Sequence, residues 1–299
     1  MTGDRVDLSI IVVNWNGGTA LRACLESAVS ATRKVEAEIW LVDNASTDGS
    51  VEQAAGAHTK LRVLRNESNL GFARAANQAI EQASGEYLLL LNPDARIDEA
   101  AVLRMLELMQ KEGLIGIAGC GSIDARDRPV PGYVMSYPGQ RGTSITQAAG
   151  EGKDVAWVSG ACLMARRAMV DEIGPLDPEF FMYYEDVDWC YRARQAGWRV
   201  VTLSELTIRH DLGGSSVQVP KQEIARRAGS SRVRFYRKHY SPVSAGWMTA
   251  RMAASAICGL VLRVGAAAVS RSAREAVSVD LGRLQGALFG GDGSRRDDG

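Results

Sequence analysis

The chain has 299 residues and a mass of 32.2 kDa; 46% of its residues are hydrophobic and 23% are charged. This length suffices for one large domain with a sizeable buried core, and the hydrophobic fraction excludes a disordered or low-complexity chain. Lys and Arg number 35 and are balanced by 35 Asp and Glu, so the formal net charge is zero. A dedicated nucleic-acid binder carries a large basic excess, and we therefore expect no nucleic-acid partner.

The charges are unevenly distributed along the chain. Met1–Asp211 contains 21 basic and 29 acidic side chains, a net charge of −8, whereas Leu212–Gly299 contains 14 basic and 6 acidic side chains, a net charge of +8. An acidic body with a basic tail predicts that the tail meets an anionic partner, either a membrane surface or a polyanion. A solvated tail with internal salt bridges is the alternative.

Cysteine usage and the apolar runs indicate the compartment. The cysteines are odd in number and none forms a C-x-x-C pair, which predicts buried thiols in a reducing compartment rather than disulfides or a zinc site. The apolar run Leu8–Val13 is too short for a secretory leader, and no stretch of about 18 uncharged apolar residues occurs, so we expect no membrane-spanning segment and a cytoplasmic protein. The five cysteines are Cys24, Cys120, Cys162, Cys190 and Cys258.

The first third of the chain alternates between strand and helix patterns. Apolar, β-branched runs predict buried strands, and apolar residues at helical spacing predict the helices between them. This alternation is typical of an α/β fold with a mostly parallel sheet and helices on both faces. The predicted strands are Leu8–Val13, Glu38–Val42, Leu61–Arg65 and Glu86–Leu91, and the predicted helices are Thr19–Ser30, Ser50–Ala57, Gly71–Gln82 and Ala100–Glu112.

The middle of the chain is less regular. Gly113–Gly152 is rich in Gly, Pro and polar residues, which predicts an irregular excursion over one face, with a hairpin as one option. Regular elements are expected again beyond it. They are strands at Val155–Ala165 and Trp198–Leu203 and helices at Arg167–Ile173 and Asp186–Ala196.

Polar residues follow three of the predicted strands at the point where each strand ends. Ligands of parallel sheets bind beyond the carboxyl ends of the strands, so three such endings predict a functional site at this edge. A turn is the alternative for any one of them, because Asn and Asp favour turns. The residues concerned are Asn14, Asn16, Asp43, Asn44, Asn92 and Asp94.

A first group of residues suits a divalent cation. Asn92-Pro93-Asp94 offers oxygen ligands of the kind that hold Mg²⁺ or Mn²⁺ on a diphosphate, although an isolated tripeptide of this kind is more often an Asx-Pro turn. His210 follows the last predicted strand and is of a type that completes a Mn²⁺ site, whereas a purely structural histidine is the commoner case.

A second group is acidic. Glu185-Asp186-x-Asp188 lies at a predicted helix start behind a run of aromatic residues. Carboxylates favour helix N-termini, so one or two of the three are candidates for mere capping residues. Three acids within four positions repel one another, which raises at least one pKa and makes that carboxylate a suitable general base for a hydroxyl nucleophile.

A third stretch suits an anionic ligand. Asn69–Asn77 opens a helix at Gly71, and the N-terminal amides of that helix together with Arg74 suit a phosphate or a ribose. Glycine at a helix start is also common in structural helices. We therefore keep both interpretations for this stretch.

Five motifs occur in order along the chain. Together they resemble the family 2 glycosyltransferases with the GT-A fold, in the branch of bacterial rhamnosyltransferases and galactofuranosyltransferases. The resemblance covers about Asp7 to Ser216, some two thirds of the chain, and implies a Rossmann-like, mostly parallel sheet. The motifs are Ser9–Asn16, Val42–Gly49, Asn69–Ala73, Leu91–Asp94 and Glu185–Arg192.

The resemblance implies a donor site. Asp43 is then the residue that holds the nucleotide base, and the loop after the first strand contacts the nucleotide. The helix start at Gly71 lies along the nucleotide and its diphosphate. The nucleotide-sugar-binding residues implied in this way are Asn14, Trp15, Asn16, Asp43, Asn44, Gly71, Arg74, Asn77 and Asn92.

The resemblance also implies the reacting groups. Asp186 is the catalytic base, and Glu185 orients the acceptor hydroxyl. Asp94 and His210 hold Mg²⁺ or Mn²⁺. Asn92 stands where the family's Asp-X-Asp motif has its first aspartate, so this chain departs from the motif at that position.

The reaction implied is inverting transfer of L-rhamnose from dTDP-rhamnose to a hydroxyl of a lipid-linked or polysaccharide acceptor, with Mg²⁺ or Mn²⁺ neutralising the departing diphosphate. Transfer from UDP-galactofuranose or another UDP-sugar is the alternative, and a non-catalytic nucleotide-sugar binding module is a further one. A nucleotidyltransferase needs a basic residue in the loop after the first strand, and Asn14–Gly18 has none.

These patterns divide the chain into three regions. We expect a glycosyltransferase domain at residues 1–216 and a basic, amphipathic helical extension at 217–289. Residues 290–299 are predicted to be a disordered tail.

The helical extension has features of a peripheral membrane anchor. Lys221–Lys238 carries seven basic residues and one acid, which predicts a helix that binds anionic lipid or the diphosphate of a polyprenyl carrier. Trp247–Val269, interrupted by Arg251 and Arg263, is predicted to lie in the headgroup plane at the cytoplasmic face of the membrane. Packing on the core, or on a second subunit in a homo-oligomer, is the alternative.

Overall fold

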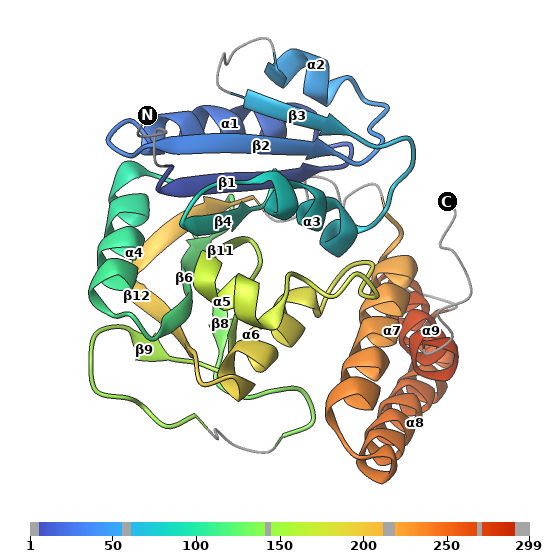
Figure 1. Cartoon of the computed structure of the whole chain (residues 1–299). Coiled ribbons are helices and arrows are strands. Elements are labelled where there is room, and N and C mark those ends of the chain that lie inside the picture. The colour runs from blue at the N-terminus through green and yellow to red at the C-terminus, as the bar shows by residue number, and fades with distance from the viewer. Residues whose placement is uncertain (1–5, 56–60, 141–144, 212–218, 268–270, 291–299) are drawn as a thin grey trace. The chain divides into compact units, whose positions relative to one another are not determined.

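The computed structural model describes residues 6–55, 61–140, 145–211, 219–267 and 271–290. The chain forms two compact units (Figure 1). The sheet unit is built from Met1–Pro178 and Asp186–Ser215, and the helical unit from Glu179–Glu185 and Ser216–Gly299. Of the tail predicted to be disordered, all residues after Gly290 lie outside the described part of the chain.

A mixed ten-stranded sheet forms the centre of the sheet unit, and a separate two-stranded sheet contains β8 and β10. The strands are β1 (Leu8–Asn14), β2 (Ala37–Asp43), β3 (Leu61–Arg65), β4 (Tyr87–Leu91), β5 (Ala95–Arg96), β6 (Ile115–Ile123), β7 (Pro129–Val130), β8 (Tyr133–Val134), β9 (Lys153–Asp154), β10 (Trp157–Val158), β11 (Cys162–Arg166) and β12 (Arg199–His210).

The strand order explains why several strand ends share one edge. The sheet runs β3-β2-β1-β4-β11-β6-β12-β5, with β7 paired to β6 and β9 to β12. The pairs β1–β2, β2–β3, β1–β4 and β6–β12 are parallel, whereas β11 is antiparallel to β4 and to β6. The parallel order 3-2-1-4 is Rossmann-like, and in such sheets the carboxyl ends of the strands form the ligand edge.

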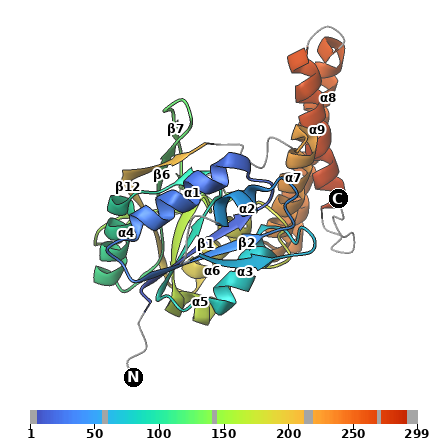
Figure 2. The same ribbon diagram turned by 90° about the horizontal axis from the view of Figure 1, so that it is seen from above.

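Helices cover both faces of this sheet (Figures 1 and 2). They are α1 (Gly18–Ala31), α2 (Ser50–Ala55), α3 (Phe72–Gln82), α4 (Glu99–Lys111), α5 (Arg167–Ile173) and α6 (Glu185–Gln195). One core lies between the sheet and α1, α2 and α4, and a second between the sheet and α3, α5 and α6. Ile10 and Ile11 belong to different cores because successive strand residues point to opposite faces. The predicted α/β fold is confirmed.

The main departure from prediction lies in the segment expected to be irregular. Within Gly113–Gly152, residues Ile115–Ile123 form β6, a strand in the middle of the sheet. The prediction was wrong here because the glycines of this strand resemble turn signals. A Cβ atom at Gly119 would lie 2.8 Å from the Cβ atom of Val158. Glycine in this strand therefore serves close packing, its second common use in sheets.

Gly119→Ala should lower the free energy of unfolding by about 1–3 kcal/mol, because the new methyl group overlaps a Val158 atom that no side-chain rotation can move. Gly113→Ala is the matched control, since a Cβ atom there meets nothing within 4 Å. Urea unfolding of both variants checks this. Equal midpoints for the two variants would contradict the packing described for β6.

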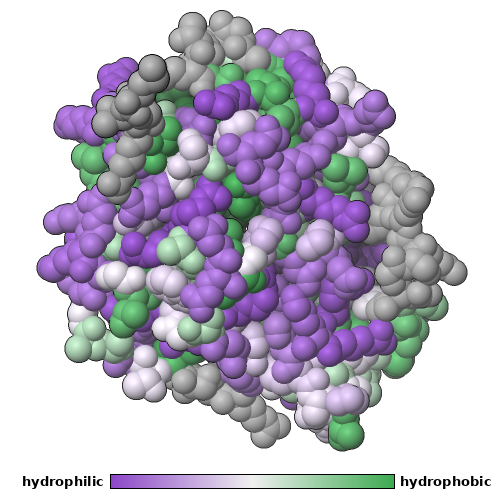
Figure 3. Space-filling view, viewed as in Figure 1, coloured by the Kyte–Doolittle hydropathy of each residue, from purple (hydrophilic) through white to green (hydrophobic). Residues whose placement is uncertain are grey.

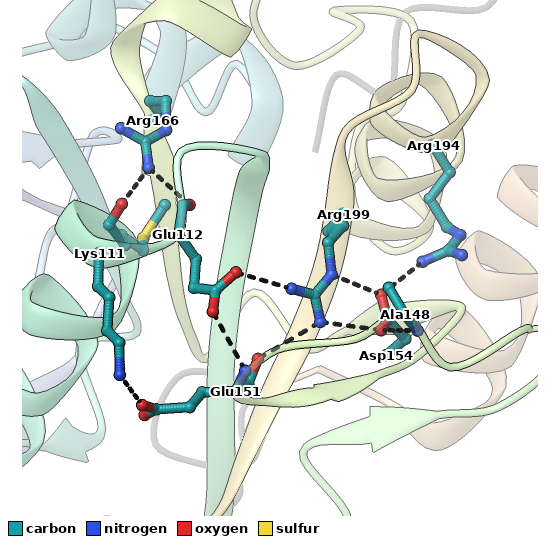
Figure 4. Close-up of polar contacts among 9 residues, drawn as sticks. Lys111, Glu112, Ala148, Glu151, Asp154, Arg166, Arg194 and Arg199 are labelled. Carbon is teal, nitrogen blue, oxygen red and sulfur yellow. Dashed lines mark hydrogen bonds and ion pairs between the residues drawn. The ribbon is translucent and has the colours of Figure 1, made fainter.

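A buried network of ion pairs lies at the end of the sheet where β12 begins (Figure 4). Arg199 donates to Asp154 at 3.0 Å and lies 3.4 Å from a carboxylate oxygen of Glu112. Asp154 is 1% exposed, and Arg194 lies 3.7 Å from it. A buried carboxylate needs such partners to remain charged. These acids therefore serve the structure, at the end of β12 opposite to His210.

The helical unit contains three long helices that lie side by side in both views (Figures 1 and 2). They are α7 (Lys221–His239), α8 (Pro242–Ala267) and α9 (Arg271–Phe289). A Cβ atom at Gly286 would lie 2.6 Å from the carbonyl oxygen of Arg226 and 2.8 Å from the Cα atom of Gly229. Glycine thus allows the backbones of α7 and α9 to approach closely.

The outer side of α8 is apolar and exposed. Val243, Trp247 and Val261 are 84%, 70% and 73% exposed, and apolar residues lie at the surface at the lower right of Figure 3, where Figure 1 places α8. By length and composition Pro242–Arg263 is able to cross a membrane, a test that core helices of soluble proteins also pass. The sequence expectation that no segment could span is therefore corrected to one weak candidate.

The cysteines largely follow the prediction. Four of the five thiols are buried, and burial raises the pKa of Cys24 and Cys190, which makes these thiols unreactive. Cys258 is the correction, because it is exposed on α8.

Candidate active site

The carboxyl ends of β1 and β2 meet because Asn14 pairs with Asp43 in their parallel register. Asn14 is fully buried and donates to the hydroxyl oxygens of Ser46 at 2.9 Å and Ser50 at 3.1 Å. Asp43 is 4% exposed, accepts from the Ser46 N–H at 3.3 Å and lies 3.9 Å from Arg65. The structure thus brings these two predicted residues together, and both hold the turn after β2.

The loops after β1 and β2 contain strained backbone. Asn16 and Ala45 have φ angles of 50° and 65°, and a left-handed residue other than glycine costs about 1–3 kcal/mol. The Asn16 N–H donates to Ser46 at 2.9 Å, and its side-chain oxygen accepts from the Thr47 N–H at 2.8 Å. Trp15 is partly exposed in the same loop. Such strain clusters at ligand sites.

Asn44 holds the segment that leads into α3. It is 2% exposed and donates to the side-chain oxygen of Asn69 at 2.8 Å and to the Gly71 carbonyl at 3.2 Å. Its own oxygen accepts from the Leu70 N–H at 2.9 Å and from Asn66 at 3.2 Å. Both donors and both acceptor positions of the amide are therefore used within the protein.

Two predicted residues of α3 contact the segment after α5. Asn77 donates to the Leu176 carbonyl at 2.7 Å and accepts from the Leu176 N–H at 3.2 Å. The exposed Arg74 donates to the Pro178 carbonyl at 3.0 Å. The structure therefore places both side chains on the chain that leads to the acidic cluster.

Asp94 and His210 face each other across the end of β12. Pairing of β5 with β12 sets His210 opposite Ala95, so its Nε2 atom lies 3.1 Å from Oδ1 of Asp94 and 3.4 Å from the side-chain nitrogen of Asn92. His210 is the last residue of β12, which is longer than the predicted strand Trp198–Leu203. These three predicted residues are thus brought together.

The spacing of this group fits a divalent cation. When two ligand atoms each lie about 2.1 Å from an ion and are at right angles to each other, they are about 3 Å apart. This distance matches the separation of the Asp94 and His210 side-chain atoms. Among the described residues, no three His, Cys, Asp or Glu side chains gather closely enough to hold a metal by themselves. An ion here would need further oxygen ligands, as Mg²⁺ commonly takes from substrate phosphates and water.

Asp186 is held at a break between two strands. Its Oδ2 atom accepts from the Gly160 N–H at 2.9 Å, and its Oδ1 atom from the Val187 N–H at 2.8 Å. Burial raises the pKa of the Asp186 carboxyl, while these N–H donors act in the opposite direction. The result is a carboxylate oriented by fixed donors and easier to protonate than an ordinary aspartate.

The break that holds Asp186 was not predicted. The sequence predicts one strand at Val155–Ala165. The structure divides this segment into β10 and β11, and Gly160 lies in the break. A glycine within a strand pattern was the available signal. The Asn92 N–H donates to the Ala161 carbonyl at 3.1 Å. Asp186 and the Asn92–Asp94 group therefore contact neighbouring residues of one short turn.

The three acids of the second cluster have different surroundings. Asp188 is fully buried and accepts from Arg192 at 2.8 Å, and this guanidinium also donates to the carbonyls of Ile173 and Pro175, both at 2.7 Å. Asp188 is therefore a structural residue. Glu185 is 8% exposed and begins α6.

Strain recurs just before these acids. Tyr183 and Tyr184 have φ angles of 69° and 70°, two consecutive left-handed residues with large side chains. Each costs about 1–3 kcal/mol and persists only where neighbouring groups hold it. The chain therefore enters Glu185 and Asp186 through a conformation that local preference opposes.

The fold agrees with the comparisons with known proteins. The family model for glycosyl transferase family 2 matches residues 9–174, more than half of the chain. The chain belongs to glycosyl transferase family 2. The family prediction is confirmed.

Named relatives of this glycosyltransferase are distant. N-acetylglucosaminyl-diphospho-decaprenol L-rhamnosyltransferase of Mycobacterium tuberculosis (strain ATCC 25618 / H37Rv) is 26% identical over 272 residues, which cover 81% of this chain and 87% of the relative. The low-salt glycan biosynthesis hexosyltransferase Agl10 of Haloferax volcanii is 27% identical over 205 residues, 63% of this chain and 62% of the relative.

Solved structures share the GT-A fold of this glycosyltransferase. The mannosyltransferase PcManGT from Pyrobaculum calidifontis, in complex with GDP-Man and Mn²⁺, matches with a TM-score of 0.60 at 18% identity, over 96% of this chain and 88% of that one. GalNAc-T7 with UDP, GalNAc and Mn²⁺ matches with a TM-score of 0.58 at 17% identity, over 77% and 48%. Identities this low establish the fold alone.

Proposed function

We propose that this glycosyltransferase moves L-rhamnose from dTDP-L-rhamnose, with inversion, to a hydroxyl of a lipid-linked or polysaccharide acceptor. One observation carries the proposal: adjacent residues of one turn contact Asp186 and Asn92. The Gly160 N–H donates to the Asp186 carboxylate, and the Ala161 carbonyl accepts from the N–H of Asn92, whose side chain lies 3.4 Å from His210 of the Asp94–His210 pair. Rhamnose and the lipid-linked acceptor are supported by the name of the mycobacterial relative.

Asp186 is the proposed catalytic base. The acceptor oxygen attacks the anomeric carbon as the bond from that carbon to the diphosphate oxygen breaks, and the acceptor proton passes to the Asp186 carboxylate. The Gly160 and Val187 N–H groups orient the carboxylate for this step. A raised pKa favours the transfer, because a more basic carboxylate accepts the proton more readily. Glu185 is the residue we propose to orient the acceptor hydroxyl.

Asp94 and His210 are the residues proposed to hold Mg²⁺ or Mn²⁺, with Asn92 beside them. When bound, the ion supplies charge neutralisation for the departing nucleoside diphosphate. The presence of Mn²⁺ in two structures of this fold supports the choice of cation. The chain itself contributes a fixed carboxylate and imidazole at the spacing that adjacent ligands require.

The strand ends of β1 and β2 are the proposed nucleotide site. Asp43, Trp15 and Asn16 lie in or beside strained loops that follow these strands, which supports direct contact with the nucleotide. Asn14 and Asn44, whose amides bond within the protein, are proposed to act by holding those loops. Three further proposed residues follow along the chain toward the diphosphate, namely Gly71, Arg74 and Asn77.

A transfer assay tests the donor and the reaction together. The purified enzyme is incubated with Mn²⁺, a polyprenyl-diphosphate-linked N-acetylglucosamine acceptor and either dTDP-L-rhamnose or UDP-galactofuranose, and the product is identified by mass spectrometry. We expect a rhamnosylated product. A galactofuranosyl product would favour the alternative donor, and nucleotide binding without any transfer would favour a non-catalytic binding module.

We further propose that α8 holds the enzyme on the cytoplasmic face of an anionic membrane. The exposed residues Val243, Trp247, Ile257 and Val261 lie along one face of α8, with Arg251 at its border. Such a face suits the headgroup region, with the arginine reaching toward lipid phosphate.

The basic residues of α7 give less support to membrane binding than their sequence suggests. Six of the seven side chains make contacts within the same helical unit, and four of these contacts are with carboxylates. Fewer of the basic side chains are therefore available to lipid. Packing of the α8 face on a second copy of the chain, in a homo-oligomer, is the alternative.

Replacing Trp247 and Val261 together by serine should weaken binding to vesicles of phosphatidylglycerol by about tenfold or more, because two apolar side chains no longer enter the headgroup region. Leu114→Ser is the control, since Leu114 is 68% exposed but lies in the sheet unit. Co-sedimentation measures binding. Unchanged binding of the double variant would contradict the α8 proposal, and concentration-dependent dimers of the wild type alone would favour the second copy.

A further inference from the structure

The segment that leads into the acidic cluster belongs to the helical unit. Glu179–Glu185 groups with the C-terminal helices, and Asp186 follows it directly in the chain. Five of the six residues from Glu179 to Tyr184 have a described contact with α7. The contacts are Glu179 with Arg234, Phe180 with Lys238, Phe181 with Arg227, Met182 with Ser231, and Tyr184 with both Arg232 and Phe235.

The contacting residues of α7 recur at helical spacing. Arg227, Ser231, Arg234, Phe235 and Lys238 stand at i, i+4, i+7, i+8 and i+11, which is one face of a helix. Four of the seven basic residues of α7 make these contacts. Three of them lie on this face and the fourth, Arg232, lies beside it. The sequence predicts that the basic side chains of α7 bind anionic lipid. In the structure, most of them hold Glu179–Tyr184.

The contacts flank the two strained tyrosines. The Ser231 hydroxyl donates to the Met182 carbonyl at 2.8 Å, which fixes the chain before Tyr183. The Arg232 Nε–H donates to the Tyr184 hydroxyl, and the Phe235 ring centroid lies 6.0 Å from that of Tyr184. A left-handed pair is stable only where its surroundings determine it. These α7 side chains supply that surrounding on both sides of the pair.

We propose that Arg232 is a positioning residue for sugar transfer. Through the Tyr184 hydroxyl it holds the left-handed pair Tyr183–Tyr184, and this pair sets the direction in which the chain enters Glu185 and Asp186. The inference rests on the role proposed above for Asp186. Under this proposal, the C-terminal helices contribute to sugar transfer as well as to membrane binding.

Kinetics of full-length variants test this. Arg232→Met should lower kcat by about 10- to 100-fold, because a small displacement of a reacting group has an effect of that size. The KM for the donor should stay within about twofold, since the proposed donor contacts lie elsewhere in the chain. Tyr184→Phe should reproduce the loss, and the double variant should be no slower than either single one. Arg232→Lys should recover most of the rate, because an ammonium group also donates to a hydroxyl.

Arg237→Met is the matched control, because Arg237 is an exposed arginine of the same helix on the other flank of the contacting face. Its kcat should equal that of the wild type. Multiplicative losses in the double variant, or a donor KM that rises while kcat is unchanged, would overturn the inference. Should Arg232→Met fail to fold, Tyr184→Phe carries the test, since it removes a single oxygen atom.

Hydrogen exchange gives a readout that needs no substrate. Backbone amides of residues 180–186 should exchange faster in Arg232→Met than in Arg237→Met when the two variants are compared at the same interval below their melting temperatures. Equal exchange in the two variants would overturn the inference whatever the kinetics. An inactive Asp186→Asn beside a fully active Arg232→Met would remove the positioning role and leave the proposed function standing, whereas a fully active Asp186→Asn would remove the proposed base.

Discussion

Asp186→Asn is expected to lower kcat by about 100- to 10,000-fold, which is the range that a positioned general base contributes. The amide keeps the size of the side chain and still accepts a hydrogen bond from the Gly160 N–H, but it takes no proton from the acceptor. Donor binding should be nearly unchanged, because the proposed nucleotide residues lie at the ends of β1 and β2. Single-turnover transfer and donor titration separate the two effects.

The pH dependence gives a second expectation for the same group. A base acts in its ionised form, and burial raises the pKa of Asp186, so the acid limb of kcat/KM should lie above the pH at which an ordinary aspartate ionises, about 3.9. The same pKa shift affects folding stability in the opposite direction: activity rises with pH as Asp186 ionises, whereas the stability that this group contributes falls. A folded-state pKa above the unfolded value contributes stability only at low pH, and this contribution is lost as pH rises through the folded pKa.

Asp186→Asn should therefore melt no lower than the wild type at neutral pH, because it removes a charge that the fold partly buries. Asp171→Asn is the control for both readouts, since Asp171 is an exposed carboxylate on α5. Normal turnover of Asp186→Asn would exclude Asp186 as the base. A large fall in melting temperature would instead indicate a structural role for its two hydrogen bonds.

Asp94→Ala is expected to remove the metal-dependent part of donor binding. At a nucleotide concentration of about 100 Kd, a protein gains about 2.7 kcal/mol of stability from its ligand. We expect dTDP with Mn²⁺ to produce such a gain in the wild type and Asp94→Ala to lose most of it, because one of the two facing ligand atoms is then absent. Melting curves with dTDP, UDP and GDP, each with and without Mn²⁺, measure this.

The same experiment assigns His210. His210→Ala should behave as Asp94→Ala if both side chains hold the ion, and the double variant should be no weaker than either single one. Glu107→Ala is the control, since Glu107 is an exposed carboxylate on α4 of the same unit. A Mn²⁺ response that survives in Asp94→Ala would contradict the proposed site.

Prediction succeeded where a local pattern decides the structure. Buried runs such as Leu8–Val13 and Glu86–Leu91 are strands because their alternating side chains enter two cores, one on each face of the sheet. Polar residues at the ends of parallel strands come together for the same reason, as Asn14 and Asp43 do. The family resemblance rests on these strand-end motifs, and it was correct.

Prediction failed where a residue's meaning depends on a distant partner. Gly119 resembles a turn signal until Val158 is seen against it, and Gly160 breaks a strand pattern so that its N–H reaches Asp186. No local pattern distinguishes these cases, because glycine serves turns and close packing alike.

The sequence by itself determined the alternation of strands and helices in the first third of the chain, the edge that carries the strand-end residues, and the family. The tertiary structure alone decided which acids are structural, how Asp94 meets His210, and that much of the basic charge of α7 serves the segment before Asp186. The physical reason is range: periodicity and strand ends are set by neighbours in the chain, whereas hydrogen-bond and ion partners are chosen among residues that only folding brings together.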